Sequence, residues 1–273
     1  MYVIKADGRK ENFNFSKIVR TALRAGVPKS EAYEIADEVE KQAYEGITTR
    51  EVLDMILEQL HDKRISYASK YDLKGALMRL GPSGFTFEKL IAEMFGILGC
   101  EVRTNVIAQG RCVSHEVDVA AKRNDESYMI ECKYRNFPGA FIGIQKALYV
   151  WARFKDLEKG YEMGKCERFD VPYLITNTKF SDQSIKYASC VGLRLKGWNF
   201  PHDESISDIL TKNKIYPVTV LRSVNARTLK LLADSNYMLC RDLSEDKLIK
   251  IGISKRMVSK IMAEVAGVIG DHG

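Results

Sequence analysis

The sequence contains no apolar run near the roughly 20 residues that a membrane-spanning helix requires. Its first residues, Met1-Tyr2-Val3-Ile4-Lys5, lack the charged, apolar and small-residue blocks of a signal peptide. Low-complexity stretches are also missing, and 45% apolar with 29% charged residues is an ordinary globular composition. These features exclude wholesale disorder and predict a cytoplasmic protein with no membrane partner.

Two common binding signatures are missing as well. The six cysteines include no Cys-x-x-Cys pair, and none lies near a pair of histidines, so no zinc site is expected. Gly164-Lys165-Cys166 lacks the upstream glycine and the following Ser or Thr of a P-loop. A nucleotide bound by this chain is therefore expected to be a regulatory ligand, not a fuel.

The charge balance is mildly basic, with 42 Lys and Arg against 36 Asp and Glu, a net charge of +6. This excess permits a polyanionic partner such as nucleic acid but does not require one. A solvated surface of mixed charge is the alternative interpretation.

Local signals divide the 273 residues into three segments. Residues 1–80 begin with a β-hairpin that turns at Asp7-Gly8. Helices follow, with Ser16, Ser30 and Thr49 as predicted N-caps, and the last of these helices is predicted over residues 66–79. Residues 84–200, after a linker at Gly81-Pro82-Ser83-Gly84, alternate helices and strands in an order typical of an α/β core with a mixed sheet. Residues 218–270 are helical. The predicted fold class is therefore multidomain α+β and α/β.

The most informative stretch is a second predicted hairpin with Asn124-Asp125 as its two-residue loop. This register places Val119 opposite Ile130 and Asp118 directly opposite Glu131, with Lys133 on the same face. Opposed carboxylates destabilise a bare hairpin, whereas Mg²⁺ binds one or two carboxylates together with substrate phosphates. Lys133 would then stabilise charge developing on a phosphate. The solvated face of an amphipathic hairpin remains the alternative interpretation.

Asp118 followed by Glu131-Cys132-Lys133 resembles the PD-(D/E)xK nuclease superfamily, and the surrounding residues from Gly84 to about Trp198 are similar to its Mrr-type restriction endonuclease branch. The resemblance implies a restriction-endonuclease-like fold that cleaves DNA with Mg²⁺ or Mn²⁺. Asp118, Glu131 and the carbonyl of Cys132 would bind the metal ion. Lys133 would position the nucleophilic water.

Two more residues match that family by position. Glu88 lies on the first helix of the segment, where the family has an acid that contributes to the metal site, and Gln145 lies on the helix after the Glu-x-Lys strand. The resemblance implies that both support the metal ion and its water shell. Glu116 departs from the pattern, because it stands where the family more frequently has glycine.

The N-terminal segment resembles the ATP-cone, a nucleotide-binding regulatory module of ribonucleotide reductases and their repressor. The resemblance rests on residues 3–9, Phe13, Lys17-Ile18 and residues 47–52. It implies ATP or dATP as a regulatory ligand. The predicted nucleotide contacts are Val3, Lys5, Arg9, Asn14 and Lys17. Ala6 departs from the family, which often has a basic residue there.

The C-terminal stretch from Leu248 to Arg256 resembles one helix-hairpin-helix unit, in which a glycine permits a tight turn and backbone amides meet a DNA phosphate. The predicted DNA-binding residues are Lys250, Gly252, Lys255, Arg256 and Lys260. A protein-interaction bundle is the alternative interpretation of these helices.

Together these patterns predict a Mg²⁺-dependent DNA endonuclease that hydrolyses phosphodiester bonds and is regulated by ATP or dATP. Two alternatives remain open. One is a non-catalytic, nucleotide-responsive DNA-binding protein. The other is a structure-selective nuclease of branched DNA, which would require a homodimer.

Overall fold

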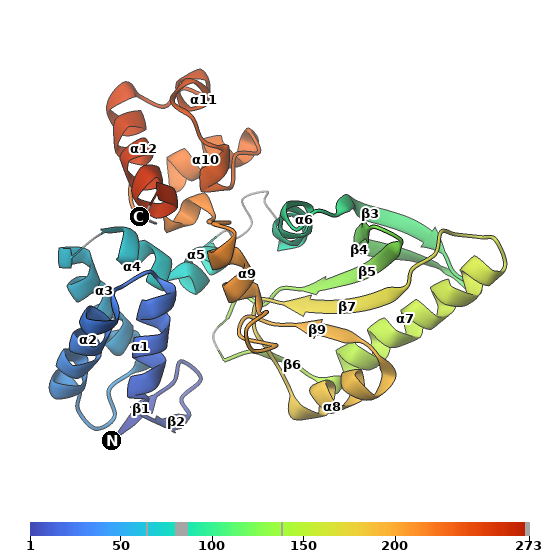
Figure 1. Ribbon diagram of the computed structural model, residues 1–273, viewed down its shortest axis with the longest axis horizontal. Helices are drawn as coiled ribbons and strands as arrows, with labels where there is room; N and C mark the ends of the chain where they lie inside the picture. The colour runs from blue at the N-terminus through green and yellow to red at the C-terminus, as the bar shows by residue number, and fades with distance from the viewer. Residues whose placement is uncertain (64, 80–86, 138, 271–273) are drawn as a thin grey trace. The chain divides into compact units, whose positions relative to one another are not determined.

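The computed structural model describes residues 1–63, 65–79, 87–137 and 139–270. It divides into two compact units, one formed by Met1–Phe85 with Lys214–Gly273 and the other by Thr86–Asn213 (Figure 1). The first and third predicted segments therefore belong to one unit. The expected linker at residues 81–84 lies outside the described residues.

The N-terminal part of the first unit is a short hairpin followed by helices. Its elements are β1 (Tyr2–Ile4), β2 (Lys10–Asn12), α1 (Phe15–Arg24), α2 (Lys29–Gln42), α3 (Thr49–Lys63), α4 (Ile65–Tyr71) and α5 (Leu73–Arg79). β1 and β2 pair antiparallel, with Val3 opposite Glu11. Apolar side chains at helical spacing on α1 and α2 form the buried core of this part, among them Ile18, Ile35 and Val39.

Two predicted helix caps in this part are wrong. Asn14, not Ser16, caps α1, because its side-chain oxygen accepts the backbone N–H of Lys17 at 2.8 Å. Ser16 lies within the first turn of that helix. Ser30 is likewise inside α2, which begins at Lys29. In both cases a residue upstream starts the helix, so the serine is already helical.

The third predicted cap is also displaced by one residue. Thr48 exchanges hydrogen bonds with Glu51 in the manner of a capping box, and Thr49 is the first residue of α3. The single helix predicted over residues 66–79 is two helices, α4 and α5, which are separated at Asp72. The Asp72 carboxylate accepts a hydrogen bond from Arg79 at 2.8 Å across α5.

The C-terminal part of the same unit is helical, as predicted. Its elements are η1 (Val218–Val220), α10 (Ala226–Asp234), η2 (Cys240–Asp242), α11 (Glu245–Lys250) and α12 (Lys255–Gly270). It is bonded to the N-terminal part: Thr219 Oγ1 donates to the Ala76 carbonyl at 2.7 Å, and Arg79 donates to the Thr219 carbonyl at 3.3 Å. The two ends of the chain thus share one folded unit.

The second unit holds a five-stranded mixed sheet in the order β3-β4-β5-β7-β9. Its elements are α6 (Phe87–Ile97), β3 (Glu101–Gln109), β4 (Ser114–Arg123), β5 (Glu126–Lys133), β6 (Phe141–Ile142), α7 (Ile144–Glu162), β7 (Val171–Thr176), β8 (Lys179–Phe180), α8 (Asp182–Val191), β9 (Arg194–Lys196) and α9 (Ile206–Lys212). β3, β4 and β5 are antiparallel, and β5, β7 and β9 are parallel. The predicted mixed sheet is confirmed.

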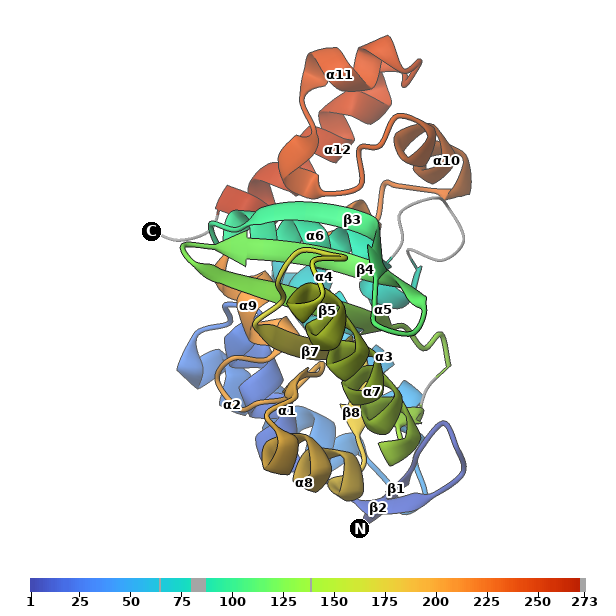
Figure 2. The same cartoon turned by 90° about the vertical axis from the view of Figure 1, so that its right-hand side faces the viewer.

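Helices cover both faces of this sheet. α6 lies on one face, and α7 crosses the other, with α8 beside it (Figure 2). On the α7 face, Met129 and Leu174 pack with Val150 and Phe154 of the helix in one buried cluster. On the α6 face, Phe95 contacts the rings of Tyr128 and Tyr173.

The predicted register of the β4–β5 hairpin is confirmed over most of its length. Val119 is opposite Ile130, and Arg123 is opposite Glu126 at the turn. Asn124 has φ +53°, a conformation that asparagine tolerates better than most residues. Alternate residues of β5 therefore face α6 and α7 in turn, which fixes the direction of the side chains that follow.

The helices that follow the hairpin extend to residue 212. α7 continues to Glu162. The residues after 200 contain α9, which Ser205 and Asp208 start with a capping box. Within the residues that the structure describes, no helix combines the length and the apolar character needed to cross a bilayer.

We predict that Gly160→Ala destabilises the second unit. Gly160 lies near the end of α7, where an added Cβ would be 2.4 Å from the Gln109 carbonyl oxygen and 2.9 Å from Gly110 backbone atoms. Because the obstacle is backbone, the helix must shift, which should lower the free energy of unfolding by about 1–3 kcal/mol in urea denaturation. Gly96→Ala on α6 is the matched control.

An added Cβ at Gly96 meets no atom within 4 Å. That substitution should therefore leave the protein as stable or raise the free energy of unfolding by up to about 1 kcal/mol through helix propensity. Equal effects of the two substitutions would contradict the close approach of α7 to the β3–β4 turn.

Candidate functional site

The predicted acids meet where β4 and β5 separate. The last paired residues before this point are Val119 and Ile130. Beyond them, Asp118 Oδ2 accepts the backbone N–H of Cys132 at 2.7 Å, in place of a main-chain carbonyl. The side chain therefore enters the gap between the strands and lies beside Glu131.

Glu131 and Lys133 lie on the α7 face of β5, as the register predicts. Glu131 is only 3% exposed. The Lys133 ammonium donates to Glu131 Oε1 and lies 3.3 Å from the Cys132 carbonyl oxygen. Asp118, Glu131 and Lys133 thus form one cluster, as predicted from the sequence.

A fourth residue, Arg153, belongs to this cluster and was missed by the sequence analysis. It lies on α7 and is 8% exposed. Its guanidinium donates to Glu131 Oε2 and to the Glu116 carbonyl, and it packs 5.3 Å from the centre of the Tyr149 ring. The sequence signal for a buried role is its position between Val150 and Phe154, which are both core residues of α7.

The remaining predicted residues lie around this cluster in different ways. Glu88 is half-buried on the first turn of α6. Gln145 is exposed on the first turn of α7, and its i, i+4, i+8 spacing places it on the same helix face as Tyr149 and Arg153. Glu116 has an exposed side chain, so it contributes only its carbonyl.

Burial, followed by the negative field of Glu131, raises the pKa of Asp118 to about 6. The N–H of Cys132 and the charge of Lys133 oppose this rise, and Glu88 adds to it. Burial and the field of Asp118 also raise the pKa of the Cys132 thiol. Cys132 is therefore a buried neutral thiol, and its backbone N–H and carbonyl, not its sulfur, make the hydrogen bonds to Asp118 and Lys133.

Buried polar groups at the end of β7 and directly after it hold the end of β5 in place. Thr176 Oγ1 donates to the Lys133 carbonyl at 2.6 Å. Asn177, 1% exposed, accepts the N–H of Arg135 at 2.8 Å and donates to its carbonyl at 2.7 Å. These contacts fix the backbone that carries Lys133.

The resemblance assigns a divalent metal ion to Asp118, Glu131 and the Cys132 carbonyl. Among the residues that the structure describes, no group of three or more His, Cys, Asp or Glu side chains is arranged to hold a metal ion. Both oxygens of Glu131 accept hydrogen bonds from cations, and Asp118 Oδ2 accepts an N–H. These residues do not fit a metal ion in the arrangement described here.

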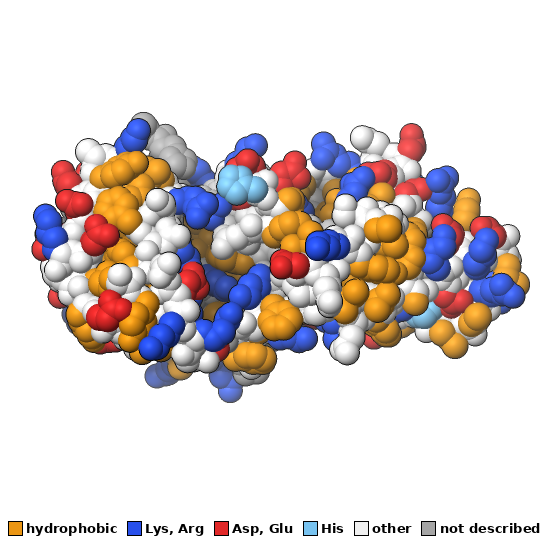
Figure 3. Space-filling view, turned by 90° about the horizontal axis from the view of Figure 1, so that it is seen from below, with side chains coloured by type: hydrophobic (Ala, Val, Ile, Leu, Met, Phe, Trp, Pro, Cys, Tyr) orange, Lys and Arg blue, Asp and Glu red, His pale blue; other side chains and the backbone are white. Residues whose placement is uncertain are grey.

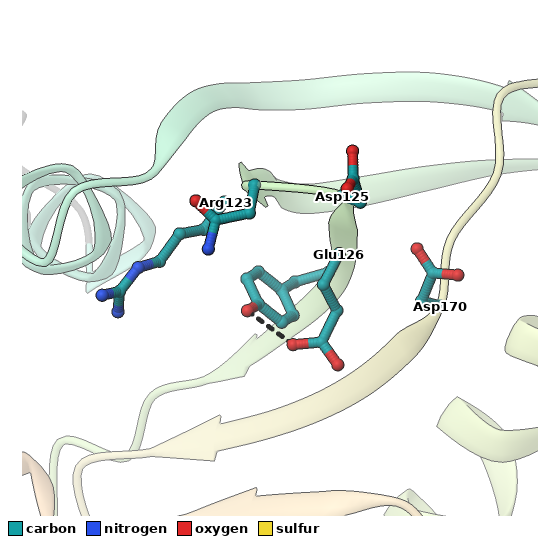
Figure 4. A pocket seen from close by; sticks show the side chains of 6 residues that line it. Arg123, Asp125, Glu126 and Asp170 are labelled. Atoms are coloured by element: carbon teal, nitrogen blue, oxygen red, sulfur yellow. Dashed lines mark hydrogen bonds between the residues drawn. The ribbon is translucent and has the colours of Figure 1, made fainter.

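A surface hollow of about 500 Å³ lies at the other end of the same hairpin, around Arg123, Asp125, Glu126 and Asp170. Figure 4 shows the Arg123 side chain extending away from the three carboxylates, and Glu126 bonded to the hydroxyl of the neighbouring tyrosine, Tyr128. None of the predicted site residues lines this hollow.

In the first unit, the predicted nucleotide contacts surround the β1–β2 hairpin and the start of α1. Lys5 pairs with Glu11 at 2.8 Å, and Arg9 pairs with Asp7 at 2.6 Å at the exposed turn. Val3 is buried in β1.

Lys17 is the basic residue at the start of α1. Although its side chain as a whole is exposed, desolvation of the ammonium group, followed by the field of Lys5, lowers its pKa. Two lysines therefore repel one another beside the helix N-terminus that Asn14 caps. An anion bound there would relieve that repulsion.

The predicted DNA-binding residues Lys250, Gly252, Lys255, Arg256 and Lys260 are all exposed around the α11–α12 turn. Gly252 has φ +87°, as a tight turn between helices requires. Over the face in Figure 3, blue basic side chains are interspersed with red acidic ones, which agrees with the mild net charge of +6.

Comparisons with known proteins identify both ends of the chain. Residues 1–73 match the model of the ATP cone domain, and residues 216–269 match the model described as AF1548-like, C-terminal. The predicted ATP-cone is therefore confirmed, and this match supports a nucleotide-binding regulatory module. The C-terminal match adds no activity, and neither match concerns the Mrr-type resemblance.

Archaeoglobus fulgidus contains two similar proteins, both described as uncharacterized. One is 43% identical over 175 residues, 63% of this chain and 95% of that protein. The other is 51% identical over 39 residues, 14% of this chain and 83% of that protein. The solved "Crystal Structure of Protein of Unknown Function AF1548" is 41% identical with a TM-score of 0.54, and the match covers 67% of this chain and 96% of that one.

We predict that Asp118→Asn stabilises the protein at pH 8 but not at pH 4. Because the pKa of Asp118 is raised to about 6 from 3.8, the folded chain binds its proton more tightly than the unfolded chain. The associated stability is complete below the unfolded pKa and is lost as pH rises through about 6. Asparagine cannot ionise, yet its oxygen can still accept the Cys132 N–H.

The expected gain at pH 8 is about 1–2 kcal/mol, since solvent screens this half-buried group, and it is measured by thermal unfolding in chelator. Asp156→Asn is a control of opposite sign. Burial raises the pKa of Asp156, but hydrogen bonds from His115 and the loop N–H groups bring it to about 2. That variant should lose stability at pH 8, and an equal gain in both variants would contradict the assignment.

Proposed function

Since this chain belongs to the AF1548-like family, whose compared members are uncharacterized, its activity must be inferred from its own residues, and we propose that it is a nucleotide-regulated DNA endonuclease. The proposed reaction is hydrolysis of phosphodiester bonds in DNA. The proposed cofactor is Mg²⁺ or Mn²⁺, which would need Glu131 to leave its present partners.

The observation that carries this proposal is the convergence of Asp118, Glu131 and Lys133 at the point where β4 and β5 separate. Two acids that repel one another raise the energy of the folded chain unless cations lie beside them. Lys133 and Arg153 neutralise Glu131. Asp118, by contrast, makes no ion pair within the described part of the chain, and burial together with this remaining repulsion raises its pKa. Glu88 adds a third negative charge whose field reaches Asp118.

Lys133 has a defined chemical role in this proposal. Its side chain is three-quarters buried, and its ammonium group donates to Glu131 and the Cys132 carbonyl. In that position it would orient a water molecule for attack and stabilise the negative charge that develops on the phosphate. Gln145, on the exposed start of α7, would support the water shell from the solvent side.

The resemblance to Mrr-type enzymes of the PD-(D/E)xK superfamily supports the same reaction class. It covers the mixed sheet and the helices on its two faces. The exposed basic residues of the α11–α12 turn would contact DNA phosphates, and each phosphate neutralised steepens the salt dependence of binding by about 0.9 in log–log slope.

A non-catalytic, nucleotide-responsive DNA-binding protein is the second candidate, and one observation favours it. Arg153 and Lys133 already neutralise Glu131, so the cluster also serves as a buried ion-pair network. Such networks fix the arrangement of a core without any reaction. This candidate predicts DNA binding that responds to ATP, with no cleavage of any DNA.

We predict that Lys133→Ala lowers DNA cleavage by roughly 100-fold or more, because the charge that stabilises the reacting phosphate is lost. The assay incubates the protein with plasmid, branched and methylated DNA, with Mg²⁺ or Mn²⁺ and with chelator. Lys122→Ala is the matched control, since Lys122 is an exposed lysine at the turn end of the same hairpin.

The control should cut at the parental rate. Cleavage by Lys133→Ala at that same rate would disprove the assigned role, and cleavage undiminished in chelator would disprove the cofactor. Failure of the parental protein to cut any of these substrates, together with DNA binding that ATP changes, would favour the non-catalytic candidate.

For the ATP-cone we propose that Lys5 and Lys17 contact the phosphates of ATP or dATP, with Val3, Arg9 and Asn14 completing the site. The mutual field of the two lysines supports this assignment, because phosphate is the chemical partner that two adjacent ammonium groups favour. Thr219 of the C-terminal part donates to Ala76 on α5, the helix that follows the cone. Through this contact, nucleotide binding to the cone would influence the C-terminal helices.

We predict that Lys17→Ala weakens ATP and dATP binding by roughly tenfold or more in titration calorimetry, since one charge-assisted phosphate contact is lost. Lys41→Ala is the control, because Lys41 is an exposed lysine of α2 in the same domain and pairs with Asp37 at 3.7 Å. The control should bind with the parental affinity. No heat of binding at millimolar nucleotide with the parental protein would disprove the nucleotide site.

A further inference from the structure

Arg153 carries a feature that the proposed reaction does not use. In the part of the chain that the structure describes, its Nε is one of the buried side-chain atoms without a hydrogen-bond partner. A buried N–H without an acceptor destabilises the arrangement that contains it. The guanidinium therefore satisfies Glu131 and the Glu116 carbonyl while leaving its third donor group unused.

Arg153 is also placed so that it can exchange partners. The side chain is 8% exposed and packs against Tyr149, which is 53% exposed and lies one turn earlier on α7. A guanidinium binds phosphate oxygens with the same planar donor geometry that it uses for carboxylates. A phosphate that reached the site would be a chemically matched alternative to Glu131.

The charges around Glu131 limit what else this carboxylate can bind. Glu131 has two oxygens, and each accepts a hydrogen bond from a cation, one from Lys133 and one from Arg153. A divalent cation that used the same carboxylate would have to displace one of them. Arg153 comes from another element, so a change of its side-chain rotamer would release Glu131 without moving the backbone of β5 or the packed core of α7.

From this geometry we propose that Arg153 is an internal counter-ion that competes with a divalent metal ion for Glu131. While Arg153 is bound, the acids hold no metal ion; when the guanidinium leaves, Glu131 and Asp118 become available to one. The inference rests on the proposed function for the identity of the ion, and on the observed ion pair for the competition. Arg153 is a positioning residue in this proposal.

The test measures Mn²⁺ affinity by titration calorimetry, without DNA. Arg153→Gln should bind Mn²⁺ at least tenfold more tightly than the parental protein, a difference of about 1.4 kcal/mol, because the competing charge is gone. Lys155→Met is the matched control. Lys155 is a basic residue of the same helix that pairs with Glu158, so its removal lowers the net charge by the same amount without touching Glu131.

A second readout follows from the stability of the variants. Without metal, Arg153→Gln should unfold at a lower temperature than the parental protein, since Glu131 loses a buried partner. Saturating Mn²⁺ should then raise its unfolding temperature by more than it raises that of the parental protein. Arg153→Lys, which keeps the charge but not the planar donors, should show a smaller gain in Mn²⁺ affinity, about threefold.

Equal or weaker Mn²⁺ binding by Arg153→Gln overturns the proposal, as does a matching gain in Lys155→Met or a lack of Mn²⁺ binding in every variant. If Arg153→Gln does not fold, the comparison passes to Arg153→Lys, and an unchanged affinity there overturns it. Tighter Mn²⁺ binding without DNA cleavage would leave the competition intact and disprove the endonuclease. DNA cleavage by the parental protein, with the same Mn²⁺ affinity in Arg153→Gln, would support the endonuclease and disprove the competition.

Discussion

The organisation of the second unit depends on one buried charge, that of Glu131. An ionised carboxylate that is 3% exposed is stable only because Lys133 and Arg153 approach it from a strand and from a helix. The contact with Arg153 connects β5 to α7, and the contact with Lys133 lies within β5 itself. Asp118 completes the arrangement by taking the Cys132 N–H where the strands part.

Much of this arrangement could be predicted from the sequence because it is local. The loop at Asn124-Asp125 and the alternation of the two strands determine the register, and the register determines that Asp118 and Glu131 meet. The ATP-cone could be recognised for the same reason, since its hairpin and first helix are contiguous. The nuclease resemblance of the central residues stays a prediction.

What could not be predicted depends on contacts between distant elements. Arg153 reaches Glu131 from 22 residues further along the chain, and nothing in the local pattern of α7 reveals that approach. The bond from Thr219 to Ala76 joins positions 143 apart. The displaced helix starts at Asn14 and Thr48 have another cause: several neighbouring polar residues can cap a helix, and side-chain geometry selects between them.

The composition of the first unit has a consequence for how the chain is made. Its N-terminal helices and its C-terminal helices are bonded through Thr219 and Arg79, while residues 86–213 are synthesised between them. During translation the five-stranded sheet has all of its strands before the first unit has its last helices. The half of the protein that begins first is thus the half that is finished last, and a break in the central part would not separate the nucleotide module from the tail.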